Sequence, residues 1–459
     1  MGNWLERVDW RAYREEGAEL LSELIRIDTS NPPGRETEAA RYLQGLFKKE
    51  GLKGELLEPE PGRGSFYLRF PGRGSGPKLM LLSHIDVVPV ADPTRWDHPP
   101  FSGALADGYV WGRGALDMKC QTITEALTLL LFKRLGLEFN GELVYLATAD
   151  EERGGEKGVG WLSREHPELL RVDYVLNEGG GEPLVVRKKV FYTIETVEKG
   201  LLWLKVRVKG RSGHGSVPHE ENALVRAAAM IDRLAHHRFP KRIEAAVEQL
   251  VTRVAGALGP EGERLGRALL ELDSRAEPDL RPLLEGTDLE PEALNAFLRT
   301  TISPTMIQAG VKENVIPDSC EFVLDCRLLP SSSREEVLAK LRELAQELGV
   351  EFDLEVLQYH PASGSPLGTD LYKAIERALR AEFPDSEIVP FLLTGATDSR
   401  FLRELGAQAY GLCPLSTKTT MQDRLKMIHG DNERIDLESL ELQVRVFTRV
   451  AADLLRAKA

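Results

Sequence analysis

A His and an Asp interrupt an otherwise apolar run in the stretch KLMLLSHIDVVPV. His84 and Asp86 stand two positions apart, and alternate residues of a strand point to the same face. Such a pair has two ordinary uses. It can form a structural hydrogen bond that satisfies both groups, or the imidazole can bind a cation while a carboxylate holds its other N–H. Taken alone, the pair favours neither use over the other.

Polar residues that could take part in the same chemistry follow other apolar runs. Asp117 stands in a Gly-rich turn before a helix, where an acid often only stabilises the helix N-terminus. Glu151 and Glu152 follow the strand-like run LVYLATA, although such an acidic run usually marks a solvated loop. Glu178 ends the run VDYVLNE, and His429 lies in a loop shortly before the last helix.

The placement of these residues is more informative than any one of them. In open α/β sheets, ligands bind at the carboxyl ends of the strands. Carboxylates crowded there would repel one another unless cations neutralised them. A set of nitrogen and oxygen ligands without Cys suits zinc or a similar divalent ion. The sequence therefore predicts a divalent metal site in which His84 binds the metal and Asp86 supports it.

The elements that must position this site fall into two groups. Up to about residue 198, and again after the Pro- and Gly-rich stretch 360–369, apolar runs alternate with helices, which indicates a layered α/β domain. Between them, alternating strands such as GLLWLKVRVKG accompany amphipathic helices, which indicates a small α+β domain with one sheet. We expect a discontinuous domain of residues 1–198 and 362–459 with a domain of residues 199–361 inserted into it.

Length, charge and cysteine content exclude some classes of protein. At about 150 residues per domain, 459 residues predict two or three domains. The net charge of -13 argues against nucleic acid or an anionic membrane surface as the main partner. The chain has no apolar run long enough to span a membrane and no apolar segment typical of a secretory signal near its start. Four cysteines without a CxxC pair predict a reduced, cytoplasmic protein.

With these residues in view, the chain resembles the dinuclear zinc hydrolases that include acetylornithine deacetylase, succinyl-diaminopimelate desuccinylase, aminoacylase and the carboxypeptidase G and S types. The resemblance implies a zinc-peptidase-like α/β catalytic domain, with a mixed central sheet flanked by helices, and an inserted α+β lid and dimerisation domain. It extends over nearly the whole chain and rests on the motifs SHIDVVP, GRGALDMK, ADEERGG, NEGG, GHGSVPH, ENVIPDSCEFVLDCR and HGDNE.

The resemblance also implies a ligand set. His84 and Glu178 would hold one divalent cation, Glu152 and His429 would hold the other, and Asp117 would bridge the two. The cations would most often be Zn²⁺, although Mn²⁺ and Co²⁺ also fit. Two metals of this kind share a water and lower its pKa.

Three further expectations concern the catalytic groups. Asp86 would brace the His84 imidazole, and Glu151 would be the general base that takes the proton of the attacking water and delivers it to the leaving nitrogen. The family has a cis peptide after the bridging acid, so we expect one between Asp117 and Met118, a rare conformation found mainly at functional sites.

The inserted domain carries a second group of implied residues. A lone His in a Gly-rich loop is more often only exposed, and an Arg at a strand end is more often a salt-bridge partner. The resemblance implies instead that His214 reaches the partner subunit's site and stabilises the oxyanion. Asn314 and Arg327 would hold the substrate carboxylate, a task suited to a guanidinium fork, together with backbone N–H groups near Gly395. Helix 222–239 and its neighbouring strand would form a homodimer surface.

The expected function is metal-dependent hydrolysis of an amide bond in a short peptide or an N-acyl amino acid with a free carboxylate. The stretch 242–300 is longer than in the compact deacetylases and is similar to the carboxypeptidase S type, so the sequence does not separate a deacylase from a dipeptidase or carboxypeptidase. A serine or nucleotide-using enzyme would carry a G-x-S-x-G elbow or a phosphate-binding loop, and neither is present. A non-catalytic binding protein on the same scaffold would be expected to lack a ligand or the base, and here Glu151 and all five ligands are present.

Overall fold

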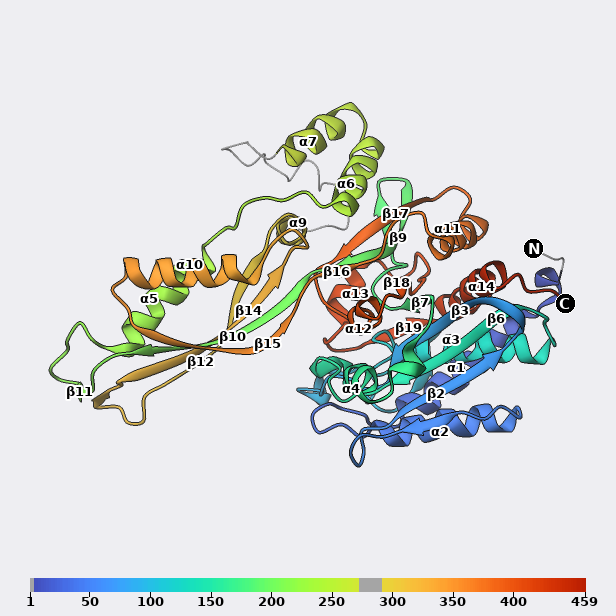
Figure 1. The fold of residues 1–459 in the computed structure, drawn as a ribbon, viewed down its shortest axis with the longest axis horizontal. Helices are drawn as coiled ribbons and strands as arrows, with labels where there is room; N and C mark the ends of the chain where they lie inside the picture. Colours follow the sequence, from blue (N-terminus) through green and yellow to red (C-terminus); the bar gives the residue numbers. More distant parts are fainter. Residues whose placement is uncertain (1–3, 272–290) are drawn as a thin grey trace.

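The computed structural model describes residues 4–271 and 291–459, which form a large body with a central sheet and a smaller, elongated body (Figure 1). The central sheet has ten strands and is mixed, because parallel and antiparallel pairs both occur in it. In spatial order its strands are β1 (Glu55–Leu57), β2 (Ser65–Pro71), β6 (Asn140–Thr148), β3 (Arg73–His84), β7 (Tyr174–Asn177), β18 (Gln408–Gly411), β9 (Lys189–Glu198) and β16 (Ser363–Gly364), while β8 (Pro183–Val186) and β17 (Glu387–Leu393) also pair with β9.

Helices cover both faces of the large sheet, and the alternation of apolar residues explains why. In β3, Leu79 and Leu81 belong to one core cluster, whereas Met80 and Leu82 belong to another on the opposite face. The first cluster includes α1 (Trp10–Ile25), α2 (Glu36–Lys49), α3 (Lys119–Arg134), α11 (Asp370–Glu382) and α14 (Leu437–Leu454). The second includes α4 (Val159–Glu165) and α12 (Ser399–Glu404).

The small body is built on a four-stranded antiparallel sheet. β9 of the large sheet continues through Lys199 into β10 (Gly200–Lys209), which is one of the connections between the two bodies (Figure 1). The spatial order is β12 (Thr301–Ala309), β14 (Ser319–Leu328), β10 and β15 (Phe352–His360), and α5 (Ala223–Ala235) and α10 (Arg334–Glu347) cover one face. The strands of the two sheets lie on opposite sides of the expected boundaries at 198/199 and 361/362; the division into domains itself stays a prediction.

The insertion at 242–300 packs against the large sheet, although it stands between elements of the small body in the sequence. Its described helices are α6 (Ala245–Ala257), α7 (Pro260–Leu270) and α9 (Pro291–Leu298). Their apolar residues share a core with β8, β9 and β17 of the large sheet, and not with the core of the small sheet. Although these helices fall within the range 199–361, they therefore extend the large body.

Short elements complete the described chain. The minor strands are β4 (Ala104–Ala106), β5 (Tyr109–Trp111), β11 (Gly213–His214), β13 (Val315–Ile316) and β19 (Arg434–Asp436), and the remaining α-helix is α13 (Met421–Met427). Single 3-10 turns are η1 (Leu5–Arg7), η2 (Pro93–Arg95), η3 (Glu151–Arg153) and η4 (Pro167–Leu170).

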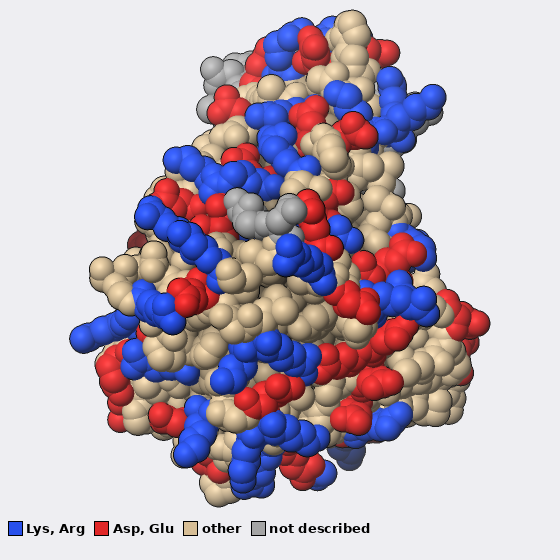
Figure 2. Space-filling view, turned by 90° about the vertical axis from the view of Figure 1, so that its right-hand side faces the viewer, with Lys and Arg blue, Asp and Glu red and all other residues tan. Residues whose placement is uncertain are grey.

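The surface carries charged side chains of both signs, and the cysteines lie inside the protein. On the face shown in Figure 2, basic and acidic side chains are interspersed and leave tan areas between them. All four cysteines are buried and free. Within residues 4–271 and 291–459, no helix combines the length and the apolar character that crossing a bilayer would require.

Candidate active site

Three neighbouring parallel strands bring most of the predicted ligands together. β3 lies between β6 and β7 and runs parallel to both, so the carboxyl ends of the three strands meet at one edge. His84 is the last residue of β3, Glu178 directly follows β7, and Glu151 and Glu152 begin η3 just after β6. The structure therefore brings these four predicted residues to the same edge of the sheet.

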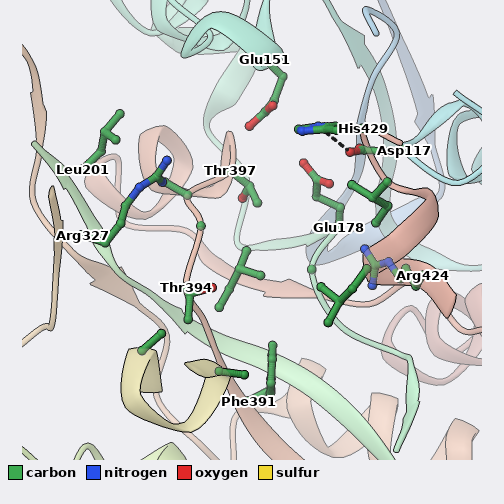
Figure 3. Close-up of a pocket in the computed structure, with 18 of the residues that line it drawn as sticks. Asp117, Glu151, Glu178, Leu201, Arg327, Phe391, Thr394, Thr397, Arg424 and His429 are labelled. Atoms are coloured by element: carbon green, nitrogen blue, oxygen red, sulfur yellow. Dashed lines mark ion pairs between the residues drawn. The ribbon is translucent and has the colours of Figure 1, made fainter. Parts of the chain in front are cut away.

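Asp117 lies between the two histidines. Its Oδ1 is 3.1 Å from His84 Nε2 and its Oδ2 is 3.3 Å from His429 Nε2 (Figure 3). Glu178 Oε1 is 3.7 Å from His84 Nε2, and Glu152 Oε2 is 3.3 Å from His429 Nε2. Two ligand atoms about 2.0–2.1 Å from one tetrahedral ion would lie roughly 3.3 Å apart. The five residues are thus spaced as two ligand pairs on either side of a shared carboxylate.

The donor atoms themselves fit divalent cations. His84 forms one group of potential ligand atoms with Asp117 and Glu152, and a second with Glu151 and Glu178; within each group all the atoms lie within 4.8 Å of one another. Glu152 Oε1 is buried and has no hydrogen-bond partner among the described residues. A buried carboxylate oxygen without a partner is costly unless a cation or a water satisfies it.

The charges in the site also favour bound divalent cations. Burial raises the pKa of Glu151, Glu152 and Glu178, the last to about 8, and neighbouring carboxylates raise these values further. Hydrogen bonds to Asp117 and Glu152 raise the pKa of His429 to about 10. Burial alone would raise the pKa of Asp117, but hydrogen bonds from His429 and His84 outweigh it and hold that pKa below its usual range. Bound divalent cations would replace these shared protons as the neutralising charge.

Asp86, whose side chain we expected to brace His84, contacts the imidazole more closely through its backbone carbonyl than through its carboxylate. β3 ends at His84, so Asp86 lies two residues beyond the strand and is fully buried. Its carbonyl oxygen is 3.0 Å from His84 Nδ1, and its carboxylate is 3.5 Å away. The carboxylate accepts hydrogen bonds from the backbone N–H groups of Glu151 and Glu152 at 3.1 and 3.2 Å. Asp86 therefore links the segment that follows β3 to the segment that follows β6.

Glu433 holds the turn that carries Asp117. Its buried Oε1 accepts hydrogen bonds from the backbone N–H groups of Gly114, Leu116 and Asp117, and its Oε2 pairs with Arg113. The peptide bond between Asp117 and Met118 in this turn is cis, as expected. Glu433 belongs to the motif HGDNE, but no pattern in that motif indicates that its partners lie more than 300 residues earlier.

Other supporting residues were also missed. Asn31 donates to the carboxylates of both Asp86 and Asp150. Asp150, which directly precedes Glu151, forms an ion pair with buried Arg63. Arg424 of α13 lines the site and pairs with Glu182. No local sequence pattern marks these contacts, because each joins segments far apart in the chain.

A cavity of about 530 Å³ opens beside the ligands (Figure 3). Glu151 points into it from η3, and Arg327 reaches it from β14. Its walls are mostly apolar and include Leu201, Trp203, Ala293, Ala296, Phe297, Phe391, Leu393, Met421, Leu425 and Ile428. The volume lies within the range of roughly 300–1,000 Å³ that is usual for small-molecule sites.

Two of the predicted substrate-binding residues line this cavity. Arg327 donates to Asp325 through Nε at 2.7 Å and Nη2 at 3.0 Å, and a guanidinium has further N–H groups for a substrate carboxylate. Gly395 lies in the loop after β17, which Glu198 holds by accepting hydrogen bonds from Thr397 N and Oγ1. The cavity thus joins the ligand cluster to a cationic group and a loop backbone.

The structure does not bring His214 and Asn314 to the cavity of their own chain. His214 is exposed in β11, which pairs with β13, and Gly215 N donates to Asn314 O. These segments lie at the end of the small body that points away from the large sheet (Figure 1). Their implied contribution to the site of a partner subunit stays a prediction.

Comparison with known proteins places this site in a family. Residues 80–453 match the model of peptidase family M20/M25/M40. The chain belongs to this family. It is 32% identical over 456 residues to N-fatty-acyl-amino acid synthase/hydrolase PM20D1 of Xenopus tropicalis, covering 95% of this chain and 85% of that protein.

Solved structures share the fold of this M20 chain. Human carnosine dipeptidase 1 matches with a TM-score of 0.73 at 16% identity, over 99% of both chains. An M20 family metallo-carboxypeptidase from Sulfolobus solfataricus matches with a TM-score of 0.71 at 19% identity, over 96% of this chain and 99% of that one. The family and the fold establish a metal-dependent hydrolase of amide bonds on a mixed α/β scaffold.

Proposed function

We propose that the enzyme hydrolyses the amide bond of N-acyl amino acids whose acyl and amino-acid parts are apolar. The observation that carries this proposal is one cavity with the ligand cluster at one end, Arg327 and the Gly395 loop along its side, and apolar walls elsewhere. The free ammonium group of a dipeptide would lose its hydration against such walls. The name of the Xenopus tropicalis relative, an N-fatty-acyl-amino acid synthase/hydrolase, supports the same substrate class.

The residues divide the work of the reaction. His84, Asp117, Glu152, Glu178 and His429 would hold two divalent cations, which when bound polarise the amide carbonyl and lower the pKa of a nearby water. Glu151 takes a proton from that water as it attacks the carbonyl carbon, and then donates the proton to the leaving nitrogen. Its burial, which raises its pKa, favours a side chain that can hold the proton between the two steps. Arg327 and the Gly395 loop hold the substrate carboxylate and fix the amide in place.

Zinc is the metal we propose for both positions. A set of two histidines and three carboxylates, with no sulfur ligand, is compatible with Zn²⁺, and Mn²⁺ or Co²⁺ would accept the same donors. Metal analysis of the purified protein, followed by reloading of the stripped protein with each ion in turn, would identify the metal that restores the highest kcat.

We propose further that the protein is a cytoplasmic homodimer. The exposed apolar side chains of Leu224 and Val225 on α5 and of Met306 and Ile307 on the edge strand β12 support a subunit interface in the small body. Four free thiols support a reducing compartment. Analytical ultracentrifugation tests the dimer, and fractionation of the source cells tests the location.

The central experiment combines metal removal with a substrate panel. We expect the native enzyme to hydrolyse N-acyl derivatives of apolar amino acids with a higher kcat/KM than the matching dipeptides. Chelation should abolish this activity, and added Zn²⁺ should restore it. Activity that survives complete metal removal would contradict the metal mechanism, and faster hydrolysis of dipeptides would contradict the proposed substrate class.

A further inference from the structure

Helix α9, at the end of the 242–300 insertion, forms one wall of the substrate cavity. Ala293, Ala296 and Phe297 line the cavity. The two alanines are three residues apart and so share a face of the helix; both are partly exposed, whereas Leu294 and Phe297 are buried. The helix therefore presents two small, partly exposed side chains to the cavity, beside Phe297, which is otherwise buried in the protein core.

The wall formed by α9 is fixed by packing and by hydrogen bonds. Phe297 packs edge-on against Phe391 of β17 with ring centroids 5.4 Å apart. The buried ammonium of Lys199 donates to the carbonyl oxygens of Ala296 and Arg299 at 3.0 and 2.7 Å, which holds the C-terminal end of the helix. The backbone N–H of Lys199 donates to Leu393 O, so the same residue ties α9 to the loop region that carries Gly395.

This wall lies next to the groups proposed to hold the substrate carboxylate. The chain leaves α9 directly into β12, where Thr301 pairs with Arg327, and Arg327 pairs on its other side with Leu201 of β10. The cavity has a second apolar wall, formed by Met421, Leu425 and Ile428. Met421 shares a buried cluster with Leu294 and Phe297 of α9, whereas Ile428 directly precedes the ligand His429.

The connectivity of an N-acyl amino acid assigns its two apolar parts to these two walls. The α-carbon carries the carboxylate, the amide nitrogen and the side chain, so a carboxylate held at Arg327 brings the side chain toward α9. The acyl chain is attached on the other side of the scissile carbonyl, which must lie at the ligands. It therefore extends along the wall that precedes His429.

We infer that Ala293 and Ala296 determine which amino-acid side chains the enzyme accepts, and that its substrates carry a large apolar side chain such as that of leucine or phenylalanine. This inference rests on the proposed function, since it requires a substrate carboxylate at Arg327. It makes α9 a selectivity element for the amino-acid part and leaves acyl-chain length to the wall that precedes His429.

The test is a two-dimensional panel of substrates. N-acetyl and N-octanoyl derivatives of alanine, leucine and phenylalanine would be assayed with wild type, Ala293→Leu, Ala296→Leu and Asn295→Leu. Leucine and alanine have similar helix propensities, and Asn295 lies on the same helix but outside the cavity lining, so Asn295→Leu adds the same side chain without filling the cavity. Thermal unfolding confirms that each variant is folded.

We expect Ala296→Leu and Ala293→Leu to lower kcat/KM for the phenylalanine derivatives by roughly 10- to 200-fold relative to the alanine derivatives, because a few methylene groups in a pocket discriminate on this scale. The fall in the ratio of kcat/KM for phenylalanine derivatives to kcat/KM for alanine derivatives should be the same for both acyl chains. Asn295→Leu should leave this ratio at its wild-type value. A wild-type enzyme that hydrolyses no member of the panel would overturn the proposed function and this inference with it. An active wild type whose Ala296→Leu variant discriminates by acyl length, or not at all, would overturn the inference alone.

Discussion

At the scale of single residues, the site separates two neighbouring acids by their surroundings. Glu151 and Glu152 follow each other in η3, and Asp86 accepts a hydrogen bond from the backbone N–H of each. Glu152 faces His429 at 3.3 Å, whereas Glu151 faces the cavity. The residue pattern alone showed only an acidic run, and only the resemblance gave the two acids different roles. The turn that carries them is held by Asp86, which follows another strand, β3.

The first prediction separates the base from the ligand. Glu151→Gln should retain both metals and lower kcat by about 10²–10⁴-fold, because it removes proton transfer while leaving the ligands in place. Glu152→Gln should instead lower the metal content of the dialysed protein. Metal analysis beside single-turnover assays measures both effects. Equal loss of metal in the two variants would show that Glu151 is a ligand, which its proximity to His84 and Glu178 makes a real alternative.

The second prediction concerns Glu433. Glu433→Gln keeps the shape but removes the charge that compensates buried Arg113, so we expect the free energy of unfolding to fall by roughly 3–5 kcal/mol. Metal affinity should fall about 10- to 100-fold, because the turn that carries Asp117 loses its support. Urea unfolding of the metal-free protein and metal titration measure the two effects. Glu438→Gln, in an exposed pair with Lys418, is the matched control and should stay within about 0.5 kcal/mol of wild type. Similar behaviour of the two variants would reject the role given to Glu433.

At the scale of elements, the sequence predicted what depends on local periodicity. Alternating and continuous apolar runs located β3, β6, β7 and β10, and His84 and Glu178 stand at the ends of two of these strands. It did not predict that α6, α7 and α9 pack on β17, because an amphipathic helix shows which face is apolar and not which sheet will cover it. It also gave no function for Lys199, whose partners lie about 100 residues later.

Lys199 gives the third prediction, a dependence of stability on pH. Burial lowers the pKa of Lys199 to about 7 in the folded protein, whereas the unfolded chain keeps a value near 10.4. Between these values the unfolded state binds the proton that the folded state has released, so the free energy of unfolding rises with pH. The free energy of unfolding of the wild type should therefore rise relative to that of Lys199→Met, by up to about 1.4 kcal/mol per pH unit between pH 7 and pH 10.

Urea unfolding at several pH values and a fixed metal concentration measures this gain. The difference between the two proteins isolates Lys199, because other titrating groups are common to both. Lys205→Met is the control: its exposed ammonium pairs with Glu355 on the sheet surface, and removing it should produce no such rise. A difference between wild type and Lys199→Met that is independent of pH would show that Lys199 keeps its proton in the folded protein throughout the range.

At the scale of the whole molecule, the two bodies meet at the cavity. Large-body residues supply the ligand cluster and the Gly395 loop, and Leu201, Trp203 and Arg327 enter from the small sheet, which β9 joins to the large one through Lys199. The far end of the small body carries His214, which the sequence motif GHGSVPH singled out and which contributes nothing to the cavity of its own chain. The implied catalytic role of His214 therefore stays a prediction, in which His214 would act at the site of a second subunit.

The last prediction tests this role by mixing two inactive proteins. His214→Ala and Glu151→Gln should each lose activity as homodimers, the first by about 10²–10³-fold if His214 stabilises the oxyanion. After subunit exchange, half of the dimers carry one subunit of each kind. In these, the site of the His214→Ala subunit has its own Glu151 and receives His214 from its partner, so one site in two is complete. The mixture should recover about a quarter of wild-type activity, as the two-fold symmetry of a closed dimer requires. If His214 acted within its own chain, every site in the mixture would lack one of the two groups and no activity would return.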